Sequence, residues 1–426
     1  MEKERVIRLM LFVLTLVGCL CTADLSRAQT QGAPDLRGEL EKLRERMEAL
    51  ERETGRKKLT GEEEEERRHY PLVAISKTHV TGGLTMILQG TLNNEEVFGG
   101  DRADGSMSAD LFLESEIAPR GTILFRMDVA QGTGLTTLPP LFVNPDGTPT
   151  GPNNDVEGWS SADTLHINEV RYEQYFKNDT LRLTVGQIDL TSYFDENEFA
   201  NKETFQFIAP LFNNNIAIDW GGNANFFGPG VVFNAHPIEL LGFSVGLFEG
   251  DGDYQDLFSD PFIAVQVELE PYTEKLEGHY RFFVWTRRTS RPSILDPAAA
   301  QSGNSGVGVS FDQELSRKVG VWGRFGTQRG KVAQFDRHAS AGVQFKEAMG
   351  REEDVIGAAF GATFIGGEYK QASGLDKNEY YGEVYYNAAF TEGVHFSPDL
   401  QYIVHPGGNG AIDPVYIYGL RGQISF

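Results

Sequence analysis

Apolar and polar residues alternate with a period of two through most of the chain after Pro71, and the apolar spacing of a helix is not sustained there. The segment 121–129 illustrates this, with Ile123, Phe125, Met127 and Val129 on one face and Thr122, Arg126 and Asp128 on the other. Such alternation predicts strands with one apolar face. We expect sixteen strands, beginning near Leu84, Ala109, Gly121, Leu165, Leu181, Gly230, Gly242, Phe262, Leu276, Ser305, Val319, Ala339, Asp354, Lys377, Val394 and Val415.

The connections between these strands alternate in length. Short links are expected at 118–121, 177–180, 236–241, 270–275, 315–318 and 391–393, and 346–353 is intermediate. Long connections fall between them, at 95–108, 131–163, 191–229, 250–261, 290–304, 326–337, 366–376 and 405–414. An outer-membrane barrel has short periplasmic turns and long external loops, whereas a soluble sandwich has no reason to gather its long loops at one end.

A barrel in lipid must also be closed, because every strand has to pair its backbone on both sides. The polar faces then line the lumen; in 279–287, His279, Arg281, Trp285 and Arg287 oppose Tyr280, Phe282 and Val284. The predicted fold class is all-β, a 16-stranded antiparallel transmembrane β-barrel over residues 81–426 with a short N-terminal coiled-coil helix. An even number of strands places both barrel ends, and the N-terminal segment, on the periplasmic side of a bacterial outer membrane.

The last strand carries a specific pattern. One face holds Tyr416, Tyr418, Leu420, Gly422, Ile424 and Phe426. This arrangement resembles the terminal signature by which outer-membrane barrel proteins are recognised for assembly, and the alternative is a buried strand of a sandwich.

The first 28 residues have the pattern of a secretory signal peptide. Three basic residues precede an apolar run at 9–18, and the small-x-small triplet Ser26-Arg27-Ala28 follows. The run is too short for a transmembrane helix, which needs about 20 residues. A competing interpretation is a lipobox, Leu16-Val17-Gly18-Cys19, in which Cys19 becomes the lipidated first residue. Both interpretations predict export into the envelope of a diderm bacterium.

Residues 29–54 predict a coiled coil. Leucine and methionine recur with 4-3-4-3 spacing at Leu36, Leu40, Leu43, Met47 and Leu50. A helix this short is marginal alone, so association with copies of itself, as a homotrimer through coiled coil and barrel, is expected. The alternative is a solvated charged helix without a partner. Residues 55–80, which include an acidic block at 62–66, are expected to form a charged linker.

Composition narrows the function classes. The excess of 61 acidic over 38 basic residues argues against nucleic-acid binding. The 2 cysteines are too few for a disulfide scaffold or a zinc ribbon. No motif for a cofactor, metal or phosphate is present, and none of the 8 histidines has the spacing to Ser or Asp that marks a nucleophile or base. We therefore expect neither a cofactor nor enzyme activity.

Two segments resemble a known family. One begins at Gly186 with GQIDLTSYFDENEFANKETFQF and continues to Asn213-Asn214-Asn215 and Gly228-Pro229-Gly230; the other is SPDLQYI from Ser397 with Pro406-Gly407-Gly408. They resemble the carbohydrate-selective, OprB-type porins over roughly 84–426. The resemblance implies a sixteen-stranded barrel that admits sugars across the outer membrane. The coiled-coil extension departs from the simplest members; others carry envelope-anchoring modules there.

A sixteen-stranded barrel leaves a channel too wide to select small solutes unless something folds inward. The segment 191–229 is rich in phenylalanine, which predicts that it packs inside the barrel and narrows it. The alternative is that it caps external loops or neighbouring subunits.

Sugar selection needs apolar surfaces for ring faces and polar groups for hydroxyls. Residues with lumen parity supply candidates of both kinds: Trp220, Trp285 and Trp322 for stacking, and Arg126, Arg281, Arg287, Arg324, Glu169, Glu379, Glu383 and Asp399 for hydrogen bonds. Each charged residue could instead pair across strands and only keep the lumen wet. The expected solutes are small carbohydrates or ions, with outer-membrane lipid around the barrel. The alternatives to a carbohydrate porin are a general or inorganic-ion porin and an envelope tether.

Deletion of residues 36–50 separates the tether from the porin. We expect the deleted protein to keep conducting in planar bilayers, even if its trimers loosen, because the barrel alone forms the pore. Loss of cell-envelope attachment with unchanged conductance would make the coiled coil the functional part.

Overall fold

The computed structural model describes one compact unit within residues 69–426. The described residues are 78–92, 100–132, 134–135, 142, 165–177, 179–221, 226–251, 254–255, 259–271, 276–301 and 303–426. The predicted signal peptide with Cys19, the coiled coil and most of the charged linker lie outside them.

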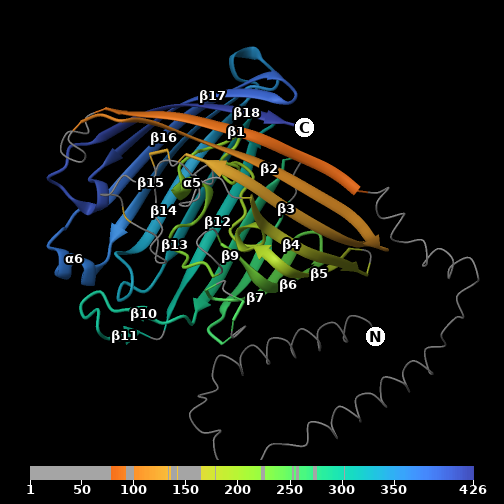
Figure 1. Ribbon diagram of the computed structural model, residues 1–426, viewed down its shortest axis with the longest axis horizontal. Coiled ribbons are helices and arrows are strands. Elements are labelled where there is room, and N and C mark those ends of the chain that lie inside the picture. The colour runs from red at the N-terminus through yellow and green to blue at the C-terminus, as the bar shows by residue number, and fades with distance from the viewer. Residues whose placement is uncertain are drawn as a thin grey trace, which may run out of the picture. The chain divides into compact units, whose positions relative to one another are not determined.

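Sixteen strands form a closed antiparallel barrel (Figure 1), which confirms the predicted all-β barrel. In chain order they are β1 (Thr78–Leu92), β2 (Ala103–Ala118), β3 (Gly121–Gln131), β4 (Leu165–Phe176), β5 (Leu181–Asp189), β6 (Phe227–Ile238), β7 (Leu241–Phe248), β8 (Phe262–Leu269), β9 (Gly278–Arg287), β12 (Asn304–Ser316), β13 (Val319–Thr327), β14 (Phe335–Lys346), β15 (Val355–Ile365), β16 (Glu379–Thr391), β17 (Val394–Val404) and β18 (Val415–Ser425). A separate two-stranded sheet, β10 (Arg291–Pro292) with β11 (Ala300–Gln301), lies in the connection between β9 and β12.

The described helices are short. They are η2 (Leu190–Ser192), α5 (Pro210–Asn213), η3 (Ala348–Gly350), α6 (Gly367–Ser373) and η4 (Pro406–Gly408). Within the described part of the chain, no helix has the length and apolarity to cross a membrane.

The barrel closes between its first and last strands. β1 and β18 pair antiparallel from Gly83 opposite Ser425 to Leu92 opposite Tyr416. Gly82 and Phe426 extend this ladder, because each backbone N–H donates to the other residue's carbonyl at 3.0 Å. The pairing leaves no edge strand, as a sheet in lipid requires.

The alternation predicted from the sequence is present in three dimensions. On β9, Tyr280, Phe282 and Val284 are 41–50% exposed, whereas Arg281 and Trp285 are 6% and 3% exposed. The final strand behaves alike, with Tyr418 at 50% and Phe426 at 72%. These outward residues form the apolar surface that faces lipid.

Strand starts lie within three residues of those expected, except for β14, which begins at Phe335 instead of near Ala339, and for the first two strands of the barrel. β1 begins at Thr78, before the expected start near Leu84 and inside the predicted linker, and β2 begins at Ala103 instead of near Ala109. Backbone pairing continues past the clear alternation there, with Thr78 opposite Ser115 and Gly90 opposite Ala103. Glycines, threonines and serines in this stretch conceal the period of two.

Adjacent residues on β3 test the inward and outward faces. Phe125 is 37% exposed on the outer face, whereas Leu124 has the opposite parity and lies opposite Glu114 and Arg171 on the flanking strands. We expect Phe125→Arg to destabilise the membrane-inserted barrel by about 2–4 kcal/mol, since the charge enters lipid. Leu124→Arg, the matched control, should cost far less because its charge faces the lumen beside Glu114 and does not enter lipid. Urea titration of folding into lipid vesicles measures both, and equal losses would contradict the assigned faces.

Candidate functional site

The connection between β5 and β6, residues 190–226, lies against the inward face of the barrel wall. We call it the inward loop; residues 190–221 and 226 of it are described. Its large apolar side chains are buried, with Phe194, Phe199, Phe207, Ile208 and Phe212 exposed by 1% or less. A loop in water would not hide so much apolar surface unless it packed against something.

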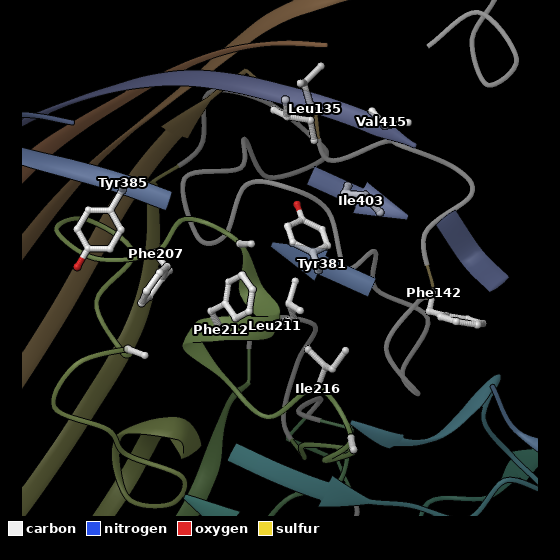
Figure 2. Packing of buried hydrophobic residues seen from close by; sticks show 14 of the residues in the cluster. Leu135, Phe142, Phe207, Leu211, Phe212, Ile216, Tyr381, Tyr385, Ile403 and Val415 are labelled. Carbon is white, nitrogen blue, oxygen red and sulfur yellow. The ribbon is translucent and has the colours of Figure 1, made fainter. Parts of the chain in front are cut away.

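Two apolar clusters hold the loop to the wall. In the first, Phe207 packs against Tyr385 of β16 with ring centroids 5.0 Å apart, and Phe212 packs against Tyr381 of β16 at 5.9 Å (Figure 2). In the second, Trp220 of the loop packs at 5.8 Å from Phe262 of β8. The connection between β3 and β4 adds Leu135 and Phe142 to the first cluster.

The wall has glycines where the loop approaches most closely. A Cβ atom on Gly320 of β13 would lie 2.3 Å from the Phe199 ring, and one on Gly326 would lie 2.3 Å from the Asn215 side chain. Neither position has room for a side chain. The inner surface of β13 is therefore shaped to fit the loop.

Arg324 of β13 is the central polar anchor. Its guanidinium Nε lies 3.0 Å from Asp195 Oδ2 of the loop, and both side chains are fully buried. It also donates to three loop carbonyls: Ala200 at 2.6 Å, Phe212 at 2.5 Å and Asp195 at 2.9 Å. Asp195 Oδ2 in turn accepts the Asn215 backbone N–H at 2.7 Å. Burial raises the pKa of Asp195 to about 6, and Arg324 opposes that rise.

Further anchors lie on both sides of Arg324 around the wall. On β9, Arg287 pairs with Asp219 of the loop at 2.7 Å, and Arg281 donates to the Glu196 carbonyl at 2.9 Å. On β16, Glu383 accepts the backbone N–H groups of Ile208 and Ala209 at 2.6 and 3.0 Å.

The farthest anchor is on β18, where Arg421 donates to the Gln206 carbonyl at 2.7 Å and also to that of Glu203. The loop thus follows the wall from β9 to β18 and covers its inward side chains.

The inward face of β2 to β5 is less covered. Arg126, Asp110 and Asp189 keep side-chain exposures of 18%, 17% and 14%, and Arg171 keeps 20%. Arg126 lies 3.5 Å from Asp110 and 3.6 Å from Asp189, and Arg171 lies 2.6 Å from Glu169 and 3.3 Å from Glu173. We call this surface the charged lane, defined by Asp110, Arg126, Asp128, Glu169, Arg171, Glu173, Arg182 and Asp189.

Aromatic rings lie against the arginines of the charged lane. The Arg126 guanidinium is 5.4 Å from the ring centroids of both Phe112 and Phe227. Arg182 and Arg171 lie 5.2 and 5.8 Å from the ring of Tyr193, the first aromatic residue of the inward loop. Such cation–π contacts hold the guanidinium groups close to the wall.

The charged lane leads toward a cavity at the end of the barrel that carries the short turns. The cavity has a volume of about 570 Å³, and its lining comes from β1 to β4 and their turns: His79, Glu114, Glu116, Arg120, Thr122, Tyr175 and Asp179. Arg120 and Asp179 form an ion pair across it at 3.6 Å. Among the described residues, no cluster of His, Cys, Asp and Glu is arranged to hold a metal ion.

Most residues singled out from the sequence lie beneath the inward loop. Trp220, Trp285 and Trp322 are 1–3% exposed within the two apolar clusters, and Arg281, Arg287 and Arg324 anchor the loop. The acidic candidates on β16 and β17 are also buried: Glu383 binds loop N–H groups, Asp399 accepts from Gln401 at 3.0 Å, and Glu379 accepts the Gly407 N–H at 2.7 Å.

Arg126 and Glu169 are the two candidates that belong to the charged lane. Their neighbours Asp110, Arg171, Glu173, Asp189 and Tyr193 were not among the residues predicted from the sequence. Glu169, Arg171 and Glu173 share one parity, and this pattern could have identified them. Their partners across the strands depend on a β-bulge between β3 and β4 near Arg126, which the sequence does not show.

Comparisons with known proteins agree with this architecture. A family model described as "Carbohydrate-selective porin, OprB family" matches residues 120–426. Porin AaxA of Chlamydia felis is 22% identical over 275 residues, which cover 62% of this chain and 59% of that protein. An uncharacterized Aquifex aeolicus protein is 24% identical over 219 residues, covering 51% of this chain and 58% of its own. The chain thus aligns with under two thirds of the length of these relatives.

Solved structures show the same fold. The high-pH structure of Pseudomonas putida OprB superposes with a TM-score of 0.70 and 17% identity, covering 85% of this chain and 97% of that one. The outer membrane channel DcaP of Acinetobacter baumannii gives a TM-score of 0.50 with 12% identity, covering 82% of this chain and 97% of that one.

Arg324→Ala tests whether the buried ion pair fastens the inward loop. Removing one partner of a buried pair leaves the Asp195 carboxyl and three loop carbonyls without their arginine donor, which costs about 3–5 kcal/mol. We expect the loop to become accessible to protease while the barrel still migrates as a folded, heat-modifiable species. Arg337→Ala is the matched control, because Arg337 on β14 is 54% exposed and forms its ion pair with its sequence neighbour Asp336. Equal protease resistance in both variants would contradict the anchoring role.

Proposed function

Because the chain belongs to the carbohydrate-selective porin family OprB, and is therefore a bacterial outer-membrane channel and not an enzyme, we propose that it allows passive, weakly selective diffusion of mono- or oligosaccharides. The observation that carries this proposal is the inward loop. Its anchors lie on β9, β13, β16 and β18, and the charged lane on β2 to β5 is left more exposed. The loop then narrows the pore, and solutes pass along the charged lane.

The chemistry of the charged lane suits uncharged sugars. A sugar offers hydroxyl groups around a ring with apolar faces, so a site needs both hydrogen-bonding groups and flat apolar surfaces. Carboxylates and guanidinium groups supply the first, and the partly exposed ring of Phe112 lies beside Arg126. Most of these polar groups already have protein partners, so each contact with a passing sugar is weak. Weak, repeated contacts let a channel release what it binds.

The proposed orientation places the short turns in the periplasm and the long loops outside, as in other outer-membrane barrels. The N-terminal segment is then periplasmic. Association as a homotrimer through coiled coil and barrel also remains part of the proposal.

A second candidate function is a general or inorganic-ion porin on the same barrel. The charged lane favours it, because a water-filled passage lined by charged side chains lets small ions through whether or not sugars bind. Sugar flux and ion conduction have to be measured separately to decide between the two.

Purified protein in liposomes and planar bilayers tests the carbohydrate proposal. We expect liposome swelling in glucose and, more slowly, in a disaccharide, and transient blockade of single-channel current by sugars. Phe112→Ala should weaken the blockade, since it removes a partly exposed aromatic face beside Arg126 of the charged lane. Tyr418→Ala, on the outer face of β18 and 50% exposed, is the matched control and should leave blockade unchanged. Ion conduction without sugar flux or blockade would favour the ion porin.

A further inference from the structure

We propose that the charged lane makes the pore prefer cationic over anionic solutes, and that Asp110 and Asp128 are the residues that set this preference. The inference deepens the proposed function, because it names the charge of the solutes that the same pore favours. It rests on the proposed passage along the β2 to β5 wall.

The two carboxylates face each other across neighbouring strands. Asp110 of β2 and Asp128 of β3 are direct partners in the β-ladder, so both side chains project from the same face. Like charges directly opposite each other repel. Arg126 lies 3.5 Å from Asp110, but it is shared with Asp189 at 3.6 Å. One guanidinium group therefore serves two carboxylates and leaves a third nearby.

Asp128 is that third carboxylate. It is 6% exposed, and its Oδ1 atom has no hydrogen-bond partner among the residues that the structure describes. A buried charge without a partner destabilises a folded protein unless something neutralises it. On the wall of a water-filled pore, a cation from solution can do so. The arrangement of Asp128 beside Asp110 thus points to a positively charged solute.

The remaining residues of the charged lane do not reverse the excess of carboxylates over guanidinium groups. Arg171 is shared between Glu169 and Glu173, and Arg182 donates to Asn234 at 3.0 Å. The lane therefore holds carboxylates at Asp110, Asp128, Glu169, Glu173 and Asp189 against guanidinium groups at Arg126, Arg171 and Arg182 only.

The arginines under the inward loop do not offset the acidic excess along the passage. Arg324 and Arg421 are 3% and 1% exposed and donate to loop carbonyls, so they are held away from the lane. Fixed charge at a narrow passage attracts counter-ions and repels ions of its own sign. Because mobile salt screens such fields beyond about 10 Å at 0.1 M, the preference should weaken as salt rises.

Reversal potentials in a KCl gradient test the proposal directly. We expect the wild-type channel to pass K⁺ severalfold better than Cl⁻, and Asp110→Asn with Asp128→Asn to bring the ratio toward unity. Asp128→Asn alone should shift it in the same direction; it removes a carboxylate whose Oδ1 atom has no hydrogen-bond partner among the described residues, and so also carries the test if the double variant does not fold. The matched control is Asp336→Asn, since Asp336 on β14 lies outside the lane and pairs with exposed Arg337.

Three sugars of similar size then connect the charge preference to solute passage. In liposome swelling, glucosamine should enter faster than glucose, and glucose faster than glucuronate, with the differences reduced in the double variant. Anion preference in the wild type, or a K⁺ to Cl⁻ ratio that neither lane variant changes, would overturn the inference. If glucose fails to enter while K⁺ preference persists, the carbohydrate function falls and the cation preference stands. If glucose enters but the channel shows no preference for cations, the cation preference falls and the carbohydrate function stands.

Discussion

The requirement that lipid imposes on the backbone determines the rest of this structure. Every strand must pair on both sides, so sixteen strands close into a ring whose ladder joins Gly83 on β1 to Ser425 on β18. A ring of that size encloses more space than its own side chains can fill. The inward loop occupies part of that space, since it brings phenylalanine, tryptophan and backbone carbonyl groups into the interior. Loop backbone placed there must itself find hydrogen-bond partners.

Buried arginines supply those partners. Arg324 and Arg421 each donate to carbonyls of the inward loop, and Glu383 accepts two of its N–H groups. A buried ion pair adds little net stability over a well-packed apolar pair, but losing one member is costly. Such anchors therefore favour one position of the loop over others, and this position divides the lumen into a covered side and the charged lane.

Sequence patterns were sufficient for the barrel, because period-two alternation and loop length depend on local residues. They gave lumen parity for Trp285, Arg281 and Arg324, but could not show that the inward loop covers these residues, since that depends on contacts across the barrel interior. The charged lane was missed for a related reason: the pairing of Asp110 with Asp128, and of Arg126 with Glu169, follows from strand register and a β-bulge. Only the fold supplies these.

The central claim is that the inward loop divides the lumen into a covered side and an accessible side. Reaction of single engineered cysteines with a water-soluble thiol reagent tests it most directly, in lipid-embedded protein with Cys19 and Cys21 absent or replaced by Ser. Thr122→Cys lies on the accessible side and lines the cavity, whereas Ser340→Cys lies on the inward face of β14, where Ser340 is 6% exposed. We predict fast modification at position 122 and slow modification at position 340. Equal rates at the two positions would contradict the account.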